Sequence, residues 1–88
     1  MNEEGLPLDQ LLAYVERAAR GDRRLSGQLY NQFQQLANMR TAPPDERALG
    51  KVLARILLGN LSPDLNELDP EAAREVSALL ERLRAEAE

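Results

Sequence analysis

Within residues 56–71, which read ILLGNLSPDLNELDPE, four carboxylate or amide side chains lie close together between positions 64 and 69. They are Asp64, Asn66, Glu67 and Asp69. A calcium-binding loop places oxygen ligands at alternate positions and turns sharply at a glycine. Counting from Asp64, Leu68 breaks that alternation, and Pro70 stands where such a loop would have to bend freely. We therefore predict no metal ion and no other cofactor, and we expect these acids to cap helices and close turns.

The sequence also offers few groups for catalysis, because it contains neither histidine nor cysteine. Histidine is the commonest general base, and both residue types are common zinc ligands. A carboxylate pair such as Glu71 and Glu75 would need an apolar pocket that raises the pKa of one member. Lys51 is the only lysine, and its place in ALGKVLAR puts it on the predicted exposed face of a helix. We predict no enzymatic activity and assign no catalytic residue.

Charge is distributed unevenly over the 88 residues, whose net charge is −4. Residues 1–20 sum to −2, residues 21–61 to +3 and residues 62–88 to −5. Within the basic middle, Arg47, Lys51 and Arg55 recur every four positions, which places them in one row along a helix. A second group of cations surrounds a predicted turn: Arg17, Arg20, Arg23 and Arg24. The acidic end carries Glu67, Glu71, Glu75 and Glu81.

This polarity has two interpretations. In the first, the helix that carries the acidic residues lies beside the basic row of the same molecule and neutralises it. In the second, the basic row of one copy meets the acidic face of another copy, and such a head-to-tail contact builds rings or filaments. The candidate partner-binding residues are Arg47, Lys51, Arg55, Glu71 and Glu75. The predicted partner is a protein, including a second copy of this chain, and the predicted function is a non-catalytic adaptor or assembly module.

Nucleic acid is the alternative partner, which would make the chain a small helical nucleic-acid-associated subunit or regulator. The isoelectric point near 4.8 argues against it, because a nucleic-acid module usually has a basic patch that dominates its charge. The three aromatic residues lie in helical stripes and form no stacking platform: Tyr14, Tyr30 and Phe33. A glutamine-rich, uncharged face around Tyr30 is a further candidate rim for a protein partner; it holds Gln28, Gln32, Gln34 and Gln35.

Two features bear on the compartment. No apolar run approaches the roughly 20 residues that a membrane-spanning helix needs. The N-terminal residues MNEEGLPLDQ are acidic, whereas a signal peptide begins with a basic stretch and continues with an apolar one. We expect a cytoplasmic protein without a membrane partner.

The elements that must position these residues are helices. Apolar residues recur at helical spacing in four stretches, which predict helices over residues 7–20, 23–39 and 44–58 and from residue 70 onward. Asp22 and Asp69 are the expected N-caps, and Gly21 and Gly59 are the expected C-terminal stops. The sequence therefore predicts one all-α domain over residues 1–88, a compact antiparallel bundle of about four helices.

Two local details remain to be settled by structure. Residues 62–67 are expected to form one short helical turn. Leu65 within this turn and Leu68 directly after it are three positions apart, and both are expected to face inward and close the end of the bundle. Gly27 costs about 1 kcal/mol relative to alanine inside a helix. It marks either a close approach of a neighbouring helix or a break of residues 23–39 into two shorter helices.

The segment ERALGKVLARILLGNLSPDLNELDPEAAREVSALLERL combines two amphipathic helices around a capped turn. Over residues 47–83 it resembles small α-helical adaptor modules, of the death-like or effector-associated kind, of bacterial signalling and defence proteins. The resemblance implies recruitment of partners by homotypic contact. Death-fold modules have six helices, whereas this sequence predicts four and one turn. No functional residue is carried over, because the contacts of such modules are variable surface charges.

Overall fold

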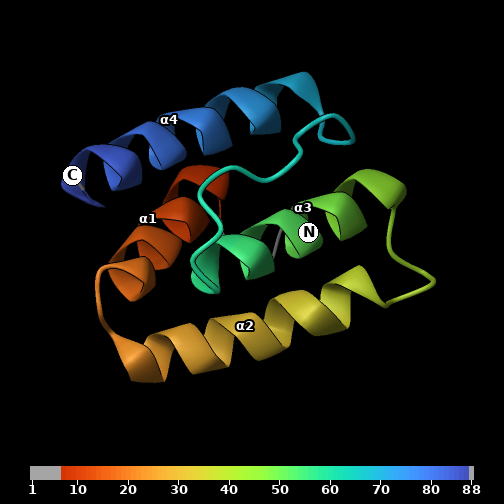
Figure 1. Cartoon of the computed structure of the whole chain (residues 1–88). Helices are drawn as coiled ribbons and strands as arrows, with labels where there is room; N and C mark the ends of the chain where they lie inside the picture. Colours follow the sequence, from red (N-terminus) through yellow and green to blue (C-terminus); the bar gives the residue numbers. More distant parts are fainter. Residues whose placement is uncertain (1–6, 88) are drawn as a thin grey trace.

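The computed structural model describes residues 7–87, which form four α-helices and, within that range, no β-strand. The helices are α1 (Leu8–Ala19), α2 (Arg23–Ala37), α3 (Pro44–Leu57) and α4 (Pro70–Ala87). Figure 1 shows α4 and α2 on opposite sides of the molecule, with α1 and α3 between them. The all-α bundle predicted from the apolar stripes is thus confirmed. None of these four helices is both long enough and apolar enough to cross a membrane.

Short-range hydrogen bonds fix where the helices begin and end. The Asp22 carboxylate accepts a hydrogen bond from the backbone N–H of Leu25 (3.1 Å), and the Asp69 carboxylate accepts one from that of Ala72 (3.3 Å). Both aspartates are therefore the N-caps that the sequence predicts. Gly21 and Gly59 follow α1 and α3 with φ angles of +130° and +98°. Side chains disfavour such angles, so glycine ends both helices.

The apolar stripes of all four helices meet in one aliphatic core. The largest fully buried side chains are Leu53, Ile56, Leu79, Leu80, Val15 and Val76. The central place of α3 is visible in its burial, because six of its residues are buried, more than in α1 or α2. Burying one such leucine or isoleucine stabilises the fold by about 1.5–3 kcal/mol.

A glycine that the sequence analysis did not single out brings α2 and α3 together. An ideal Cβ at Gly50 would lie 2.9 Å from the carbonyl oxygen of Phe33 and 3.3 Å from the side chain of Leu36. These helices run antiparallel and side by side (Figure 1). Gly27, by contrast, has nothing within 4 Å of such a Cβ, and α2 continues through it unbroken. Gly27 therefore marks neither a helix contact nor a break.

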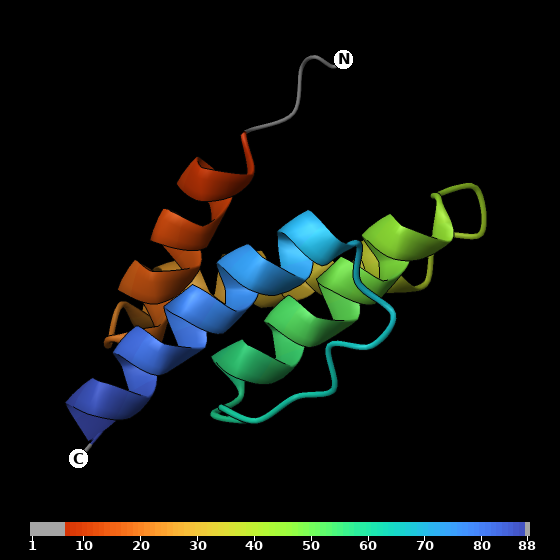
Figure 2. The same cartoon turned by 90° about the horizontal axis from the view of Figure 1, so that it is seen from above.

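The connector, residues 58–69, runs back along α3 instead of turning sharply. Glu67 lies near Pro44 and Ala48 at the start of α3, whereas Arg84 near the end of α4 donates hydrogen bonds to the carbonyl oxygen of Leu61 (3.0 and 2.6 Å). Consequently α3 and α4 run in the same direction, as Figure 2 shows from above. The predicted antiparallel arrangement holds for α2 and α3 but not for α3 and α4.

The turn expected within residues 62–67 lies slightly later and is not helical. It is closed by a hydrogen bond from the backbone N–H of Leu68 to the carbonyl oxygen of Leu65 (3.1 Å). Leu68 is buried in the core and Leu65 packs against it, so their predicted inward orientation is confirmed. The second helix also ends earlier than the predicted residue 39, at Ala37, where the Asn38 side chain donates to the Gln34 carbonyl oxygen (2.9 Å).

Candidate functional site

The acidic segment that opened the sequence analysis serves to shape the connector. The Asp64 carboxylate accepts from the backbone N–H of Asn66 (2.9 Å), and the Asn60 side chain accepts from that of Ser62 (3.0 Å). Asp69 caps α4. Over residues 7–87, no three acidic residues cluster in a way that could hold a metal ion. The prediction that the chain uses no metal stays a prediction.

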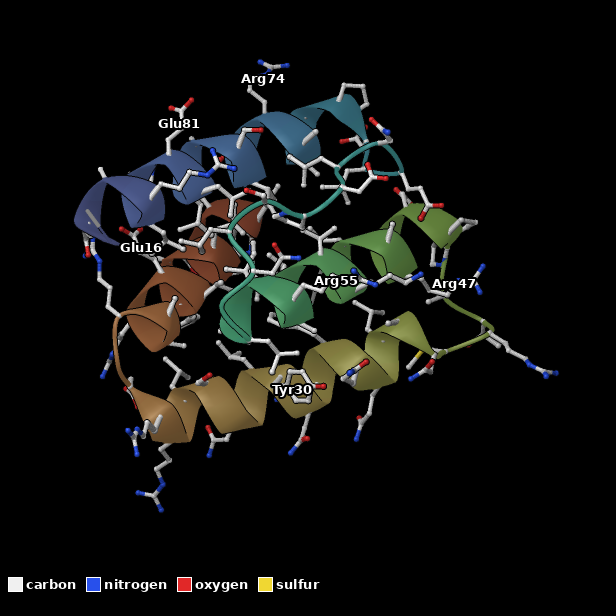
Figure 3. All side chains as sticks on the ribbon, viewed as in Figure 1. Glu16, Tyr30, Arg47, Arg55, Arg74 and Glu81 are labelled. Atoms are coloured by element: carbon white, nitrogen blue, oxygen red, sulfur yellow. The ribbon has the colours of Figure 1, made fainter. Side chains whose placement is uncertain are left out.

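The basic row lies on α3, as its spacing requires. Lys51 and Arg55 are exposed, whereas Arg47 is half-buried and its Nε is buried with no hydrogen-bond partner. Within the described residues, none of these three side chains forms an ion pair with a carboxylate. Figure 3 shows Arg47 and Arg55 on the same side of the molecule. The exposed, unpaired part of the row is therefore Lys51 and Arg55.

The candidate acids lie on a different side of the fold. Glu71 and Glu75 are both exposed on α4. They share a flank of that helix with Arg82 and Glu86, because the intervals of four, seven and four residues match helical turns. That flank faces α1, since the Glu16 side chain on α1 accepts hydrogen bonds from Arg82.

Ion pairs within the described chain join α4 to α1 and leave α3 out. Arg82 and Arg20 both approach Glu16, at N–O distances of 3.2 and 2.7 Å. Arg20 also contacts Glu86, so that four charges alternate across the two helices. The interpretation that α4 neutralises the basic row is therefore wrong for residues 7–87. The acid of α4 that forms an ion pair is Glu86, and its partner is Arg20 at the end of α1. Glu71 and Glu75 form no ion pair with Lys51 or Arg55.

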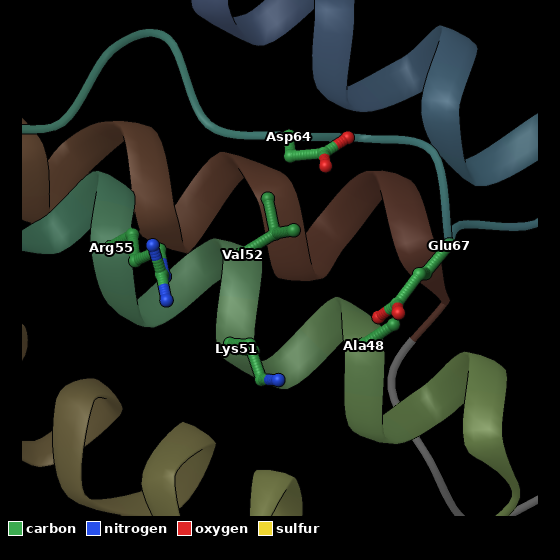
Figure 4. A pocket seen from close by; sticks show the side chains of 6 residues that line it. All are labelled: Ala48, Lys51, Val52, Arg55, Asp64 and Glu67. Carbon is green, nitrogen blue, oxygen red and sulfur yellow. The ribbon is translucent and has the colours of Figure 1, made fainter.

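The acids that do approach the basic row come from the connector. A hollow of about 260 Å³ is lined by Lys51 and Arg55 on α3 and by Asp64 and Glu67 on the connector (Figure 4). Glu67 points from the connector toward α3 in that view. The nearest carboxylates thus border the row on one side without forming an ion pair with it. The structure thus places Glu67, which was not one of the candidate residues, beside the row, and it places the candidate acids Glu71 and Glu75 away from it.

One residue that matters for the surface was missed by the sequence analysis. Leu58 caps α3 and is 69% exposed, the most exposed large apolar side chain in the described chain. Its exposure could have been predicted from the sequence, because it lies two residues beyond the core residue Ile56 and so points away from the apolar stripe.

No protein family model, curated protein or solved structure matches this chain.

Proposed function

We propose that this protein is a non-catalytic interaction module that assembles with other proteins, including copies of itself, through charged faces. The observation that carries the proposal is the separation of its two charged faces. Lys51 and Arg55 are exposed on α3 and unpaired within residues 7–87, while Glu71 and Glu75 are exposed on the α1-facing flank of α4. Opposite charges that lie apart on one surface remain solvated in the single molecule and are available to pair with complementary charges of another molecule.

The geometry of the two faces supports a contact between copies. Each face presents two charges one helical turn apart, with a Cβ spacing of about 5–6 Å. Two helices packed side by side would therefore match the cations of one copy to the acids of the next. Because the two faces differ, the contact is heterologous and propagates from copy to copy.

The contact is expected to be weak. Exposed ion pairs contribute roughly 0.2–1 kcal/mol each, so two or three of them hold a pair of copies together only at high concentration. Many copies, or a fused larger partner, would raise the effective concentration and make the assembly stable. We further infer an adaptor role in bacterial signalling or defence, for which the support is the resemblance of residues 47–83 to small helical adaptor modules.

Sedimentation velocity and light scattering at low and high salt test this proposal. We expect the wild type to self-associate at low salt and to dissociate as salt screens the exposed charges. The double variant Lys51→Glu, Arg55→Glu should stay monomeric; Arg47 is left unchanged because it is half-buried. The matched control Arg40→Glu, Arg74→Glu makes the same change in net charge at exposed positions outside the row. A wild type that is monomeric at all concentrations, or a control that dissociates equally, would contradict self-assembly.

A further inference from the structure

A groove runs between α2 and the C-terminal half of α3 and crosses the exposed Leu58. It consists of two hollows that share Leu58, one of about 590 Å³ and one of about 350 Å³. From α2 they are lined by residues at helical intervals of three, four and three: Gly27, Tyr30, Gln34 and Ala37. From α3 they are lined by Lys51, Ala54, Arg55 and Leu58. The groove therefore follows two neighbouring helices for several turns and has the length of a docked helix.

The hollow around Gly27 and Tyr30 is the mainly apolar part of the groove, and it is open. Gly27 contributes no side chain, and nothing lies within 4 Å of where its Cβ would be. Tyr30 is half-buried, and its hydroxyl accepts a hydrogen bond from the Gln34 side chain (2.6 Å), which holds the ring in place. Tyr30 lies on the face turned toward the viewer in Figure 3, as does Arg55. Tyrosine is enriched at the buried centre of protein interfaces, and the exposed Leu58 beside it adds apolar contact area.

The charge of the groove identifies its occupant. Among the lining residues that the structure describes, Arg23, Lys51 and Arg55 are cations and none is a carboxylate. The carboxylates Asp64 and Glu67 border Lys51 and Arg55 on their other side, in the separate hollow against the connector. An apolar floor with a cationic rim complements a helix that carries apolar anchors on one face and acidic residues on its flanks.

A second copy of this chain does not fit the groove. Two copies facing each other through Leu58 would bring the same three cations together, and like charges in contact are destabilising. The acidic flank of α4 lacks an anchor, because the exposed large apolar residues of the described chain are Tyr14, Met39 and Leu58, none of them on α4. The occupant is therefore a different protein.

We propose that the α2–α3 groove binds an acidic amphipathic helix of a partner protein, with Leu58 and Tyr30 contacting its apolar face and Arg23, Lys51 and Arg55 contacting its acids. This site goes beyond the proposed self-assembly, which uses Glu71 and Glu75 as its acidic half. Because Lys51 and Arg55 belong to both surfaces, a bound helix and self-assembly exclude one another.

The test is an NMR titration of the ¹⁵N-labelled protein with a synthetic helical peptide of about 15 residues, a length that spans the groove at 1.5 Å per residue. The peptide carries leucines at intervals of three and four and glutamates on both flanks. We expect amide shifts centred on Gly27, Tyr30 and Leu58. Binding should weaken at least about tenfold in Leu58→Ser and in Arg55→Glu, whereas Arg74→Glu, an exposed cation outside the groove, should bind as the wild type does.

Three controls decide between this inference and its rivals. A peptide with lysines in place of the glutamates should not bind. A Glu71→Gln, Glu75→Gln variant should bind the acidic peptide at least as tightly as the wild type does, which separates this site from self-assembly. Circular dichroism of Leu58→Ser checks that the fold is intact. No shifts at millimolar peptide, equal binding of the lysine peptide, or shifts centred on α1 and α4 would overturn the inference. Stronger shifts of the same groove residues by an oligothymidine would replace the protein partner with nucleic acid.

Discussion

Gly50 and Gly27 show how two glycines inside helices differ in their physical role. At Gly50 a Cβ would meet the backbone of α2, at 2.9 Å from the Phe33 carbonyl oxygen, so the two helices could accept it only by moving apart. At Gly27 the same Cβ would meet nothing within 4 Å. Alanine is about 1 kcal/mol more favourable than glycine in a helix interior. The surroundings must therefore decide the sign of each substitution.

We predict opposite effects of the same substitution at the two positions. Gly27→Ala should raise the free energy of unfolding by about 0.5–1 kcal/mol, because it gains helix propensity at no steric cost. Gly50→Ala should lower it by about 1–3 kcal/mol, because overpacking outweighs the propensity gain. Urea unfolding followed by circular dichroism measures both. Equal stabilisation by the two substitutions would show that the α2–α3 contact is looser than described.

At the scale of the element, α4 depends on its first turn and on its ties to two neighbours. Asp69 caps it through the Ala72 N–H, Arg84 ties it to the connector at Leu61, and Arg82 ties it to α1 at Glu16. The cap is the one of these three contacts that acts within a single helix. It is therefore the contact whose removal tests the helix alone.

Asp69→Ala should lower the free energy of unfolding by about 0.5–2 kcal/mol, the usual cost of a lost N-cap. Asp69→Asn should recover most of that loss, since asparagine caps about as well as aspartate. Chemical denaturation of the three proteins under one set of conditions makes the comparison. If asparagine were no better than alanine at this position, the Asp69 carboxylate would be acting through its charge and not as a cap.

Whether a contact of these helices can be predicted from the sequence depends on how many positions separate its two residues along the chain. Asp69 and the residue it caps are three positions apart, so the cap is visible in the sequence itself. Arg82 and Glu16 are 66 positions apart, and among many exposed charges nothing in the sequence selects that pair. For the same reason the path of the connector could not be predicted, and the predicted antiparallel arrangement was wrong for α3 and α4. Gly50 was missed because the contact that explains it, at Phe33, lies in another helix.

At the scale of the whole molecule, a chain of 88 residues has a small margin of stability, on the order of 4–13 kcal/mol. Leu53 is fully buried, with 0% of its surface exposed, in the central helix. Leu53→Ala should cost about 2–5 kcal/mol through lost burial and the cavity that remains. Thermal unfolding should then occur at a much lower temperature than in the wild type. An unchanged melting temperature would mean that the core around α3 can collapse to fill the space.

The two charged faces lie on different helices, α3 and α4, and their separation permits a charge-exchange test. One variant, Lys51→Glu with Arg55→Glu, has two acidic faces. The other, Glu71→Lys with Glu75→Lys, has two basic faces. Each should fail to self-associate, because like charges would meet at every contact. A mixture of the two should associate again, because each contact between unlike variants pairs opposite charges.

Sedimentation velocity of the two variants, alone and mixed in equal amounts at low salt, is the measurement that tests this most directly. We predict monomers in each separate sample, larger species in the mixture, and the loss of those species at high salt as the charges are screened. Circular dichroism of both variants confirms that each keeps its helices. A mixture that stays monomeric while the wild type associates would contradict a contact between the α3 cations and the α4 acids.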